Sequence, residues 1–130
     1  MTARLDTNVL IRHLTGDPPE IAARASAYLL SGRDFVLSDL VVAEIVYVLE
    51  SFCQKTREQV AGLVAAVVSS SRFRVQNRSL LIRSLEIYLD HKIDFTEAYL
   101  VATAEQAGIN EVASFDRAID RVPTITRVEP

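Results

Sequence analysis

The stretch that decides the fold is Arg4-Leu5-Asp6-Thr7-Asn8-Val9-Leu10-Ile11. Residues 3–5 are too few for anything but a short strand, and this strand stops at Asp6. Thr7 and Asn8 are residue types that favour turns and helix caps, and an apolar run resumes immediately after them. Because ligands of open α/β sheets bind outside the carboxyl ends of the strands, Asp6 is a candidate site residue. The alternative is that Asp6 only caps the helix that follows.

Length and composition favour a single folded domain over residues 1–130. With 49% hydrophobic and 24% charged residues, the chain does not have the composition of a disordered protein. No apolar run approaches the ~18 residues of a membrane span, and the first residues leave no room for a signal peptide. Cys53 is the only cysteine and cannot form an internal disulfide. These features predict a cytoplasmic protein without a membrane segment.

Short apolar strands alternate with longer helical stretches along the rest of the chain. Strands are expected at 34–37, 73–75, 112–114 and 124–126, and helices at 17–31, 39–52, 57–68, 78–89 and 94–108. Asp17 is expected to cap the first of these helices, with Pro18 in its first turn. Strands joined by helical crossovers predict the α/β class: a single three-layer domain with a parallel sheet of about five strands and helices on both faces.

Glu44 lies in a helix that is apolar on nearly every side, Leu40-Val41-Val42-Ala43-Glu44-Ile45-Val46-Tyr47-Val48-Leu49. Such a helix is typically buried, and a carboxylate inside it is costly unless it is paired, protonated or bound to a cation. The alternative is a narrow solvent-facing stripe through Glu44, Tyr47 and Ser51.

Three further acids lie at the ends of expected elements. Asp94 and Glu97 are three residues apart in the first turn of one helix, so they share a face, although the same spacing is that of a capping box. Asp116 follows the strand at 112–114, where Ser114 and Asp116 alternate to one side, although Asp116 is also placed to cap the short segment 117–120.

The common placement of these acids is more informative than any one of them. In a parallel sheet, the ends of strands and the starts of the following helices converge on one edge. Two like charges ~4 Å apart repel by about 4 kcal/mol at an effective dielectric near 20, so a cluster of ionised acids requires a counter-charge. Carboxylate oxygens suit Mg²⁺ or Mn²⁺ better than zinc. Such an ion supports hydrolysis or transfer at phosphorus, with a free carboxylate taking a proton from the attacking water.

Four segments of the chain together resemble the PIN-domain family, in particular the VapC-type toxin ribonucleases of toxin–antitoxin pairs. These segments are Leu5-Asp6-Thr7-Asn8-Val9-Leu10, Ser38-Asp39-Leu40-Val41-Val42-Ala43-Glu44, Asp94-Phe95-Thr96-Glu97-Ala98-Tyr99-Leu100 and Ser114-Phe115-Asp116-Arg117. The resemblance covers nearly the whole chain.

The resemblance implies that Asp6, Glu44 and Asp116 are the first, second and fourth acids of a metal-binding catalytic cluster. The third position usually holds Asp, and here it is Glu97. Asp94, one turn earlier, is also often acidic in relatives, so either residue is a candidate for the third ligand.

Several polar residues near these acids match supporting positions of the family. Thr7, Asn8 and Ser114 are expected to orient the acids or a water molecule. Arg12, Arg117 and Arg121 lie close to the acids in sequence and are candidates for contacts with the RNA backbone, with ordinary solvated arginines as the alternative.

The resemblance further implies a Mg²⁺- or Mn²⁺-dependent endoribonuclease that leaves a 5′-phosphate and a 3′-hydroxyl. A homodimer and a cognate antitoxin protein are expected as partners, with RNA as the substrate. A non-catalytic PIN-fold binding module is the main alternative. A Mg²⁺-dependent phosphatase or a receiver-like domain fits poorly, because Asn8 stands where such a phosphatase needs a second Asp, and Gln76 and Asn77 follow the third strand where a receiver needs its phosphate-accepting Asp.

Overall fold

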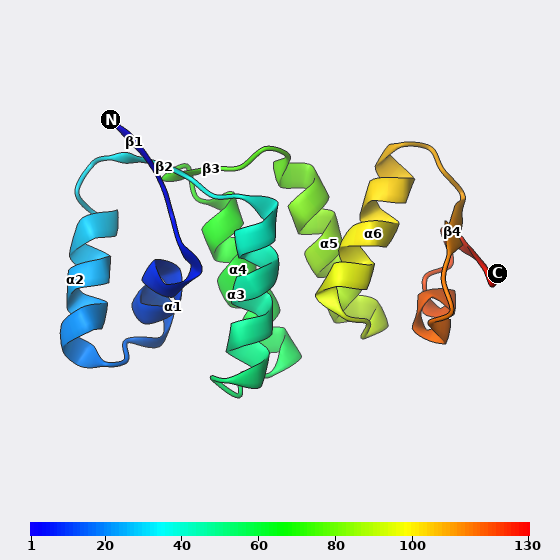
Figure 1. Cartoon of the computed structure of the whole chain (residues 1–130), viewed down its shortest axis with the longest axis horizontal. Coiled ribbons are helices and arrows are strands. Elements are labelled where there is room, and N and C mark those ends of the chain that lie inside the picture. Colours follow the sequence, from blue (N-terminus) through cyan, green and yellow to red (C-terminus); the bar gives the residue numbers. More distant parts are fainter. The chain divides into compact units, whose positions relative to one another are not determined.

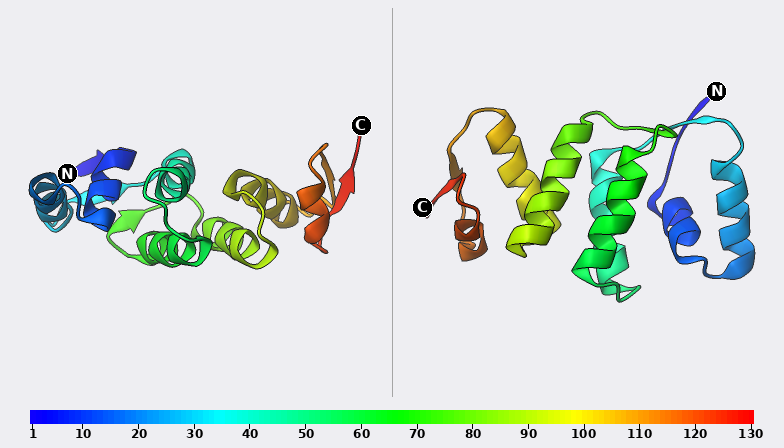
Figure 2. Two further views of the ribbon diagram at one scale, coloured as in Figure 1. Left: turned by 90° about the horizontal axis from the view of Figure 1, so that it is seen from below. Right: turned by 180° about the vertical axis from the view of Figure 1, so that it is seen from behind.

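The computed structural model describes residues 1–130, which divide into two compact units, Met1–Gln76 and Asn77–Pro130. The first unit contains β1 (Thr2–Arg4), α1 (Thr7–Thr15), α2 (Pro19–Leu29), β2 (Asp34–Val36), α3 (Asp39–Ser51), α4 (Arg57–Ser69) and β3 (Phe73–Arg74) (Figure 1). Helix α1 packs against α2 and α3, and α3 packs against α4 (Figure 2). None of the helices combines the length and hydrophobicity that crossing a membrane would require.

The sheet of the first unit is parallel, with strand order β1-β2-β3. Its register aligns Ala3, Phe35 and Phe73 across the three strands. Phe35 and Phe73 are buried, with ring centroids 6.2 Å apart. Arg4 and Arg74 are exposed because alternate residues of a strand point to opposite faces. This sheet therefore has one apolar, buried face and one polar face.

The second unit contains α5 (Arg78–His91), α6 (Phe95–Gln106), β4 (Glu111–Ala113), the 3₁₀ helix η1 (Arg117–Arg121) and β5 (Thr126–Val128). Helices α5 and α6 lie side by side (Figures 1 and 2). Strands β4 and β5 form a parallel pair. Leu81 and Tyr88 are fully buried, and Tyr88 meets Phe95 edge-on at 6.3 Å between ring centroids. The unit thus has its own apolar centre.

Most helix starts follow from the local sequence. The side chain of Ser38 accepts a hydrogen bond from Val41 N (3.2 Å), and that of Asn77 accepts one from Leu80 N (3.1 Å). Thr56 and Gln59 form a complete capping box at the start of α4. The prediction for Asp17 was wrong, since α2 begins at Pro19 with Pro18 as its N-cap. The extended conformation of Pro18 already supplies the cap geometry one residue later.

The α/β class and the parallel pairing of strands are confirmed. Five strands occur, as a three-stranded sheet in the first unit and a two-stranded sheet in the second. Strand β5 lies two residues later than predicted, at Thr126–Val128, where Thr126 N donates to Asn110 O (2.9 Å). One continuous sheet with helices on both faces, and a single domain over residues 1–130, stay predictions.

Replacing the Thr56 cap tests the contribution of the capping box to the first unit. We expect Thr56→Ala to lower the free energy of unfolding by about 1 kcal/mol, because the amide of Gln59 loses its acceptor. Urea denaturation followed by circular dichroism measures the change. Ser69→Ala, at the exposed end of the same helix, is the matched control and should shift stability by less than about 0.5 kcal/mol. Equal losses in the two variants would contradict the role of the box.

Candidate active site

Asp6 stands between β1 and α1, with its carboxylate exposed. The pairing of β1 with β2 continues to Leu5, whose N–H donates to Val36 O at 3.2 Å. Asp6 occupies the N-cap position of α1, yet its side chain accepts no hydrogen bond from the first turn. Capping is therefore not what this carboxylate does in the structure, and it is left available at the carboxyl end of β1.

The two residues after Asp6 differ in their surroundings. Thr7 is buried, with 2% of its surface exposed, and its Oγ1 has no hydrogen-bond partner. An unsatisfied buried hydroxyl costs about 1–3 kcal/mol, so a group that bonds to it would be stabilised there. Asn8 is exposed on the first turn of α1. Thr7 is thus the better placed of the two to support a ligand beside Asp6.

Glu44 is exposed, and the prediction that its helix is buried on nearly every side was wrong. Helix α3 buries only the face that carries Val42, Ile45, Val46 and Leu49. Tyr47 is 61% exposed on the same side as Glu44, as is Ser51, so the solvent-facing stripe is the correct description. Because Glu44 is exposed, its negative charge does not require a counter-ion.

Asp94 occupies the N-cap position of α6, and its exposed side chain likewise makes no capping hydrogen bond. The capping box that its spacing from Glu97 allows is not formed. The carboxyl group of Glu97 instead lies close enough to that of Asp116 for each to shift the pKa of the other. The first turn of α6 and the segment after β4 therefore meet through their acidic side chains.

Glu97 and Asp116 carry opposite pKa shifts. Burial, the hydrogen bond with Asp116 and the negative charges of Asp116 and Asp94 raise the pKa of Glu97 to about 7. The N–H of Ala118, followed by the hydrogen bond with Glu97, holds the pKa of Asp116 below its usual range. Below about pH 7, Asp116 is thus the ionised partner and Glu97 the one that holds a proton. The Oε2 atom of Glu97 is buried without a hydrogen-bond partner.

Local hydrogen bonds fix the position of Asp116. Its Oδ1 accepts from Ala118 N (2.9 Å), so the predicted cap of η1 is present together with the contact to Glu97. Its backbone N–H donates to Ser114 Oγ (3.0 Å), which supports the orienting role expected of Ser114. The loop between β4 and η1 therefore holds the carboxylate in place from both sides.

Arg127 supports the same loop and was missed by sequence reasoning. Its Nη1 donates to Ser114 O at 2.9 Å, and its guanidinium forms ion pairs with Asp120 (3.0 Å) and Glu129 (3.1 Å). Its positive charge also contributes to lowering the pKa of Asp116. No signal in the sequence indicated this residue, because the strand was expected to end at 126.

The arginines proposed for RNA contacts differ in how they are held. Arg12 is half-buried and donates to Asp17 O at 3.3 Å. Arg121 donates to Lys92 O at 2.8 Å, and its charge contributes to the low pKa of Asp116. Arg117 is exposed, and its side chain makes no hydrogen bond or ion pair.

The donor set suits a hard divalent cation. Neither unit by itself gathers three or more His, Cys, Asp or Glu side chains into a group that could hold a metal ion. In the second unit, the carboxyl groups of Glu97 and Asp116 lie close together, and one oxygen of Glu97 has no hydrogen-bond partner. In the first unit, Asp6 is uncapped beside the unsatisfied hydroxyl of Thr7. Unsatisfied oxygens of this kind are ligands that Mg²⁺ and Mn²⁺ prefer.

Comparison with known proteins gives two findings. A family model described as PIN domain matches residues 4–125, which takes in most of both units. Among solved structures, a match is the crystal structure of VapC20 from Mycobacterium tuberculosis, described as a toxin that cleaves the sarcin–ricin loop. It is 21% identical, with 89% of this chain and 90% of that chain covered and a TM-score of 0.46. The comparison with curated proteins found no match.

The raised pKa of Glu97 predicts a specific pH dependence of stability. As the pH rises from about 4.5 towards 7, the unfolded chain releases this proton and the folded chain retains it, so Glu97 makes the folded state progressively less favourable. We expect Glu97→Gln to become more stable than the wild type over this range, with a constant advantage above pH 8. Urea denaturation in EDTA at pH 4.5, 6 and 8 measures it.

Glu111→Gln is the matched control, because Glu111 is an exposed acid of the same unit without a resolved interaction. Its stability relative to the wild type should not depend on pH. An advantage of Glu97→Gln that is the same at all three pH values would contradict the shared proton.

Proposed function

The chain belongs to the PIN-domain family, and on this basis we propose that it is a metal-dependent endoribonuclease and the toxin of a VapBC-type toxin–antitoxin pair. Proteins of this family are nucleases, which supports a hydrolase that acts on phosphodiester bonds. The proposed reaction adds water across a phosphodiester bond of RNA and leaves a 5′-phosphate and a 3′-hydroxyl.

The observation that carries the proposal is the pair of neighbouring acids Glu97 and Asp116, in which Asp116 is fixed by Ala118 N–H and Glu97 Oε2 is buried without a partner. Two carboxyl groups in contact, with a third acid close enough to raise a pKa, form an arrangement that is unfavourable for folding alone. A divalent cation would replace the shared proton and relieve the repulsion. The pair therefore supports a site selected for binding a cation.

We propose that Asp6, Asp94, Glu97 and Asp116 hold the cation, with Glu44 as a further acid of the catalytic cluster. The PIN-domain model matches residues 4–125, which include all five of these acids, and this supports the assignment. Mg²⁺ or Mn²⁺ bound there would polarise a phosphate oxygen and lower the pKa of a bound water. The same reasoning supports a single nuclease domain over residues 1–130.

The chain's own residues contribute positioning and proton transfer. Asp116 is held ionised by Ala118 N–H and located by Ser114, so it presents a fixed negative charge. A carboxylate outside the ligand set can accept a proton from the attacking water, and an exposed acid such as Glu44 is suited to this role. Thr7 and Asn8 are proposed to orient Asp6, and Arg12 and Arg117 to contact phosphates of the RNA.

The proposed toxin acts in the cytoplasm and has a cognate antitoxin protein and a second copy of the chain as partners. These proposals follow from the VapC-type assignment. A gene for a small DNA-binding protein next to the gene of this chain would support the assignment.

Cleavage by the purified chain is the direct test. We expect labelled single-stranded RNA to be cut in Mn²⁺ or Mg²⁺ and left intact in EDTA. Asp6→Asn should lower the rate by roughly 100-fold or more, because even a group that only orients a metal ligand is worth about 10–100-fold. The fold should survive, since Asn is as good an N-cap as Asp.

Asp90→Asn removes the same charge from an exposed position on α5 and should cut RNA at the wild-type rate. Full activity of Asp6→Asn would remove Asp6 from the site. No metal-dependent cleavage by the wild type would favour the non-catalytic binding module.

Metal binding is testable without activity. We expect millimolar Mn²⁺ to raise the melting temperature of the wild type, because the ion binds the folded state and relieves carboxylate repulsion. At 100 times its dissociation constant, a ligand adds about 2.7 kcal/mol of stability. Asp116→Asn, which keeps an oxygen for Ala118 N–H, should lose most of this gain. An unchanged transition of the wild type in Mn²⁺ would contradict clustering of the acids.

A further inference from the structure

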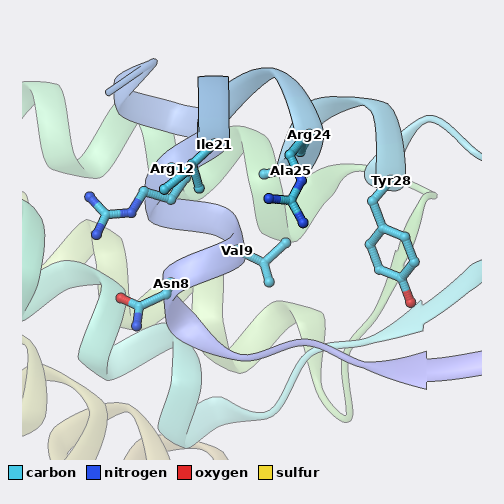
Figure 3. A pocket seen from close by; sticks show the side chains of 7 residues that line it. All are labelled: Asn8, Val9, Arg12, Ile21, Arg24, Ala25 and Tyr28. Atoms are coloured by element: carbon cyan, nitrogen blue, oxygen red, sulfur yellow. The ribbon is translucent and has the colours of Figure 1, made fainter. Parts of the chain in front are cut away.

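A groove lies between α1 and α2 in the first unit, with a volume of about 520 Å³ (Figure 3). Helix α1 contributes Asn8, Val9 and Arg12 to it. Arg12 lies three residues after Val9 and four residues after Asn8, so both share a face of the helix with it. Asn8 lies two residues after Asp6, and the groove therefore begins next to a proposed catalytic acid.

Helix α2 faces the groove with residues at helical spacing, Ile21, Arg24, Ala25 and Tyr28. Ile21 is 47% exposed and Tyr28 is 37% exposed, so apolar and aromatic surface is accessible in the groove. The small side chain of Ala25 leaves space between the larger residues. The groove volume falls in the range of about 300–1,000 Å³ that is typical of ligand sites.

The charge of the groove is positive and uncompensated. Arg12 has only a main-chain oxygen, Asp17 O at 3.3 Å, as hydrogen-bond acceptor. Arg24 makes no hydrogen bond or ion pair. No carboxylate is among the side chains that line the groove. Two guanidinium groups without an anionic partner make this groove complementary to an anionic ligand.

Tyr28, the aromatic residue of the groove, is held in place by neighbouring side chains. The ring of Tyr28 lies 5.3 Å from that of Phe35, and the guanidinium of Arg33 lies 5.5 Å from the centre of the Tyr28 ring. In Figure 3, Val9 points into the space between the helices, while Arg24 and Tyr28 extend along α2. A fixed aromatic ring beside arginines that have no anionic partner is a combination that binds single-stranded nucleic acid, with base and phosphate contacted together.

We propose that this groove binds nucleotides of single-stranded RNA next to the cleaved bond, with phosphates at Arg12 and Arg24 and a base against Val9, Ile21 and Tyr28. The inference rests on the proposed ribonuclease function and extends it to a substrate subsite. Arg12 lies about 9 Å along α1 from Asp6, at 1.5 Å per residue, so RNA in the groove would lie within a few nucleotides of Asp6. An apolar protein segment would leave both arginines without a partner.

The test measures the binding of fluorescein-labelled single-stranded RNA to the full chain by fluorescence anisotropy, in EDTA so that the RNA stays intact. Each phosphate contact contributes about 0.7 to the slope of log affinity against log salt concentration. We expect Arg12→Gln with Arg24→Gln to lower this slope by about 1.4. This corresponds to roughly 25-fold weaker binding at 0.1 M salt, relative to 1 M.

Arg74→Gln is the matched control for charge, because it removes an exposed arginine from the polar sheet face of the same unit. It should leave the salt slope unchanged. A second pair of variants keeps the test independent of the arginines. Ile21→Glu puts a negative charge in the groove and should weaken binding, whereas Ala23→Glu puts it on an exposed position of the same helix outside the groove and should not.

Cleavage of the same RNA in Mn²⁺ distinguishes failure of the proposed groove subsite from failure of the proposed ribonuclease function. If the wild type cleaves and the groove variants show a raised KM, the subsite and the function are both supported. If the wild type cleaves and the groove variants bind and cleave RNA as the wild type does, the subsite is overturned and the function stands. The groove would then be a candidate site for a protein segment instead. If the wild type neither binds nor cleaves RNA, the function and the subsite fall together.

Discussion

Two neighbouring carboxyl groups repel each other when both are ionised, and this repulsion governs the second unit. Glu97 and Asp116 meet because α6 starts and η1 starts at the same place, each with an acid in its first turn or at its cap. The protein resolves the conflict by raising the pKa of Glu97 and lowering that of Asp116. A proton or a cation in the pair would relieve this repulsion, and PIN-domain nucleases generally use divalent metal ions.

At two helix starts, an acidic side chain stays unbonded where it could have stabilised the helix. Asp6 and Asp94 both occupy N-cap positions, and neither side chain bonds to the helix it precedes. A capping Asp is commonly worth about 1 kcal/mol, so the two sites forgo stabilisation that their residue type could supply. Ser38, Thr56 and Asn77, which are not candidate ligands, do cap their helices. Stability given up at specific positions is a common property of functional sites.

Local features of the fold could be predicted from the sequence, and features that depend on distant partners could not. The caps at Ser38, Thr56 and Asn77 involve residues three positions apart, so the sequence alone indicates them. Strand β5 was placed two residues too early, and the ion pairs of its Arg127 with Asp120 and Glu129 could not be read from the sequence. The burial of α3 was overestimated because hydrophobicity does not show which apolar face is covered.

In the candidate site, too, local features could be predicted from the sequence and contacts between distant residues could not. Asp6, Asp94, Glu97 and Asp116 were identified from their positions at element ends, and Glu44 from an apolar helix that is in fact exposed on its side. The proximity of Glu97 and Asp116, nineteen residues apart, required coordinates. The hydrogen bonds that locate Asp116 follow from Ser114 in the sequence, but the support from Arg127 does not.

Arg127 also determines how much of the chain the Asp116 loop requires. The loop at Ser114 is held by a residue that lies thirteen positions later in the chain, on a strand that pairs with β4. A chain truncated before Arg127 would lack the guanidinium that donates to Ser114 O and forms the ion pair with Asp120. Proteolytic removal of the last few residues would therefore alter the surroundings of Asp116 while leaving every acid of the candidate site in place.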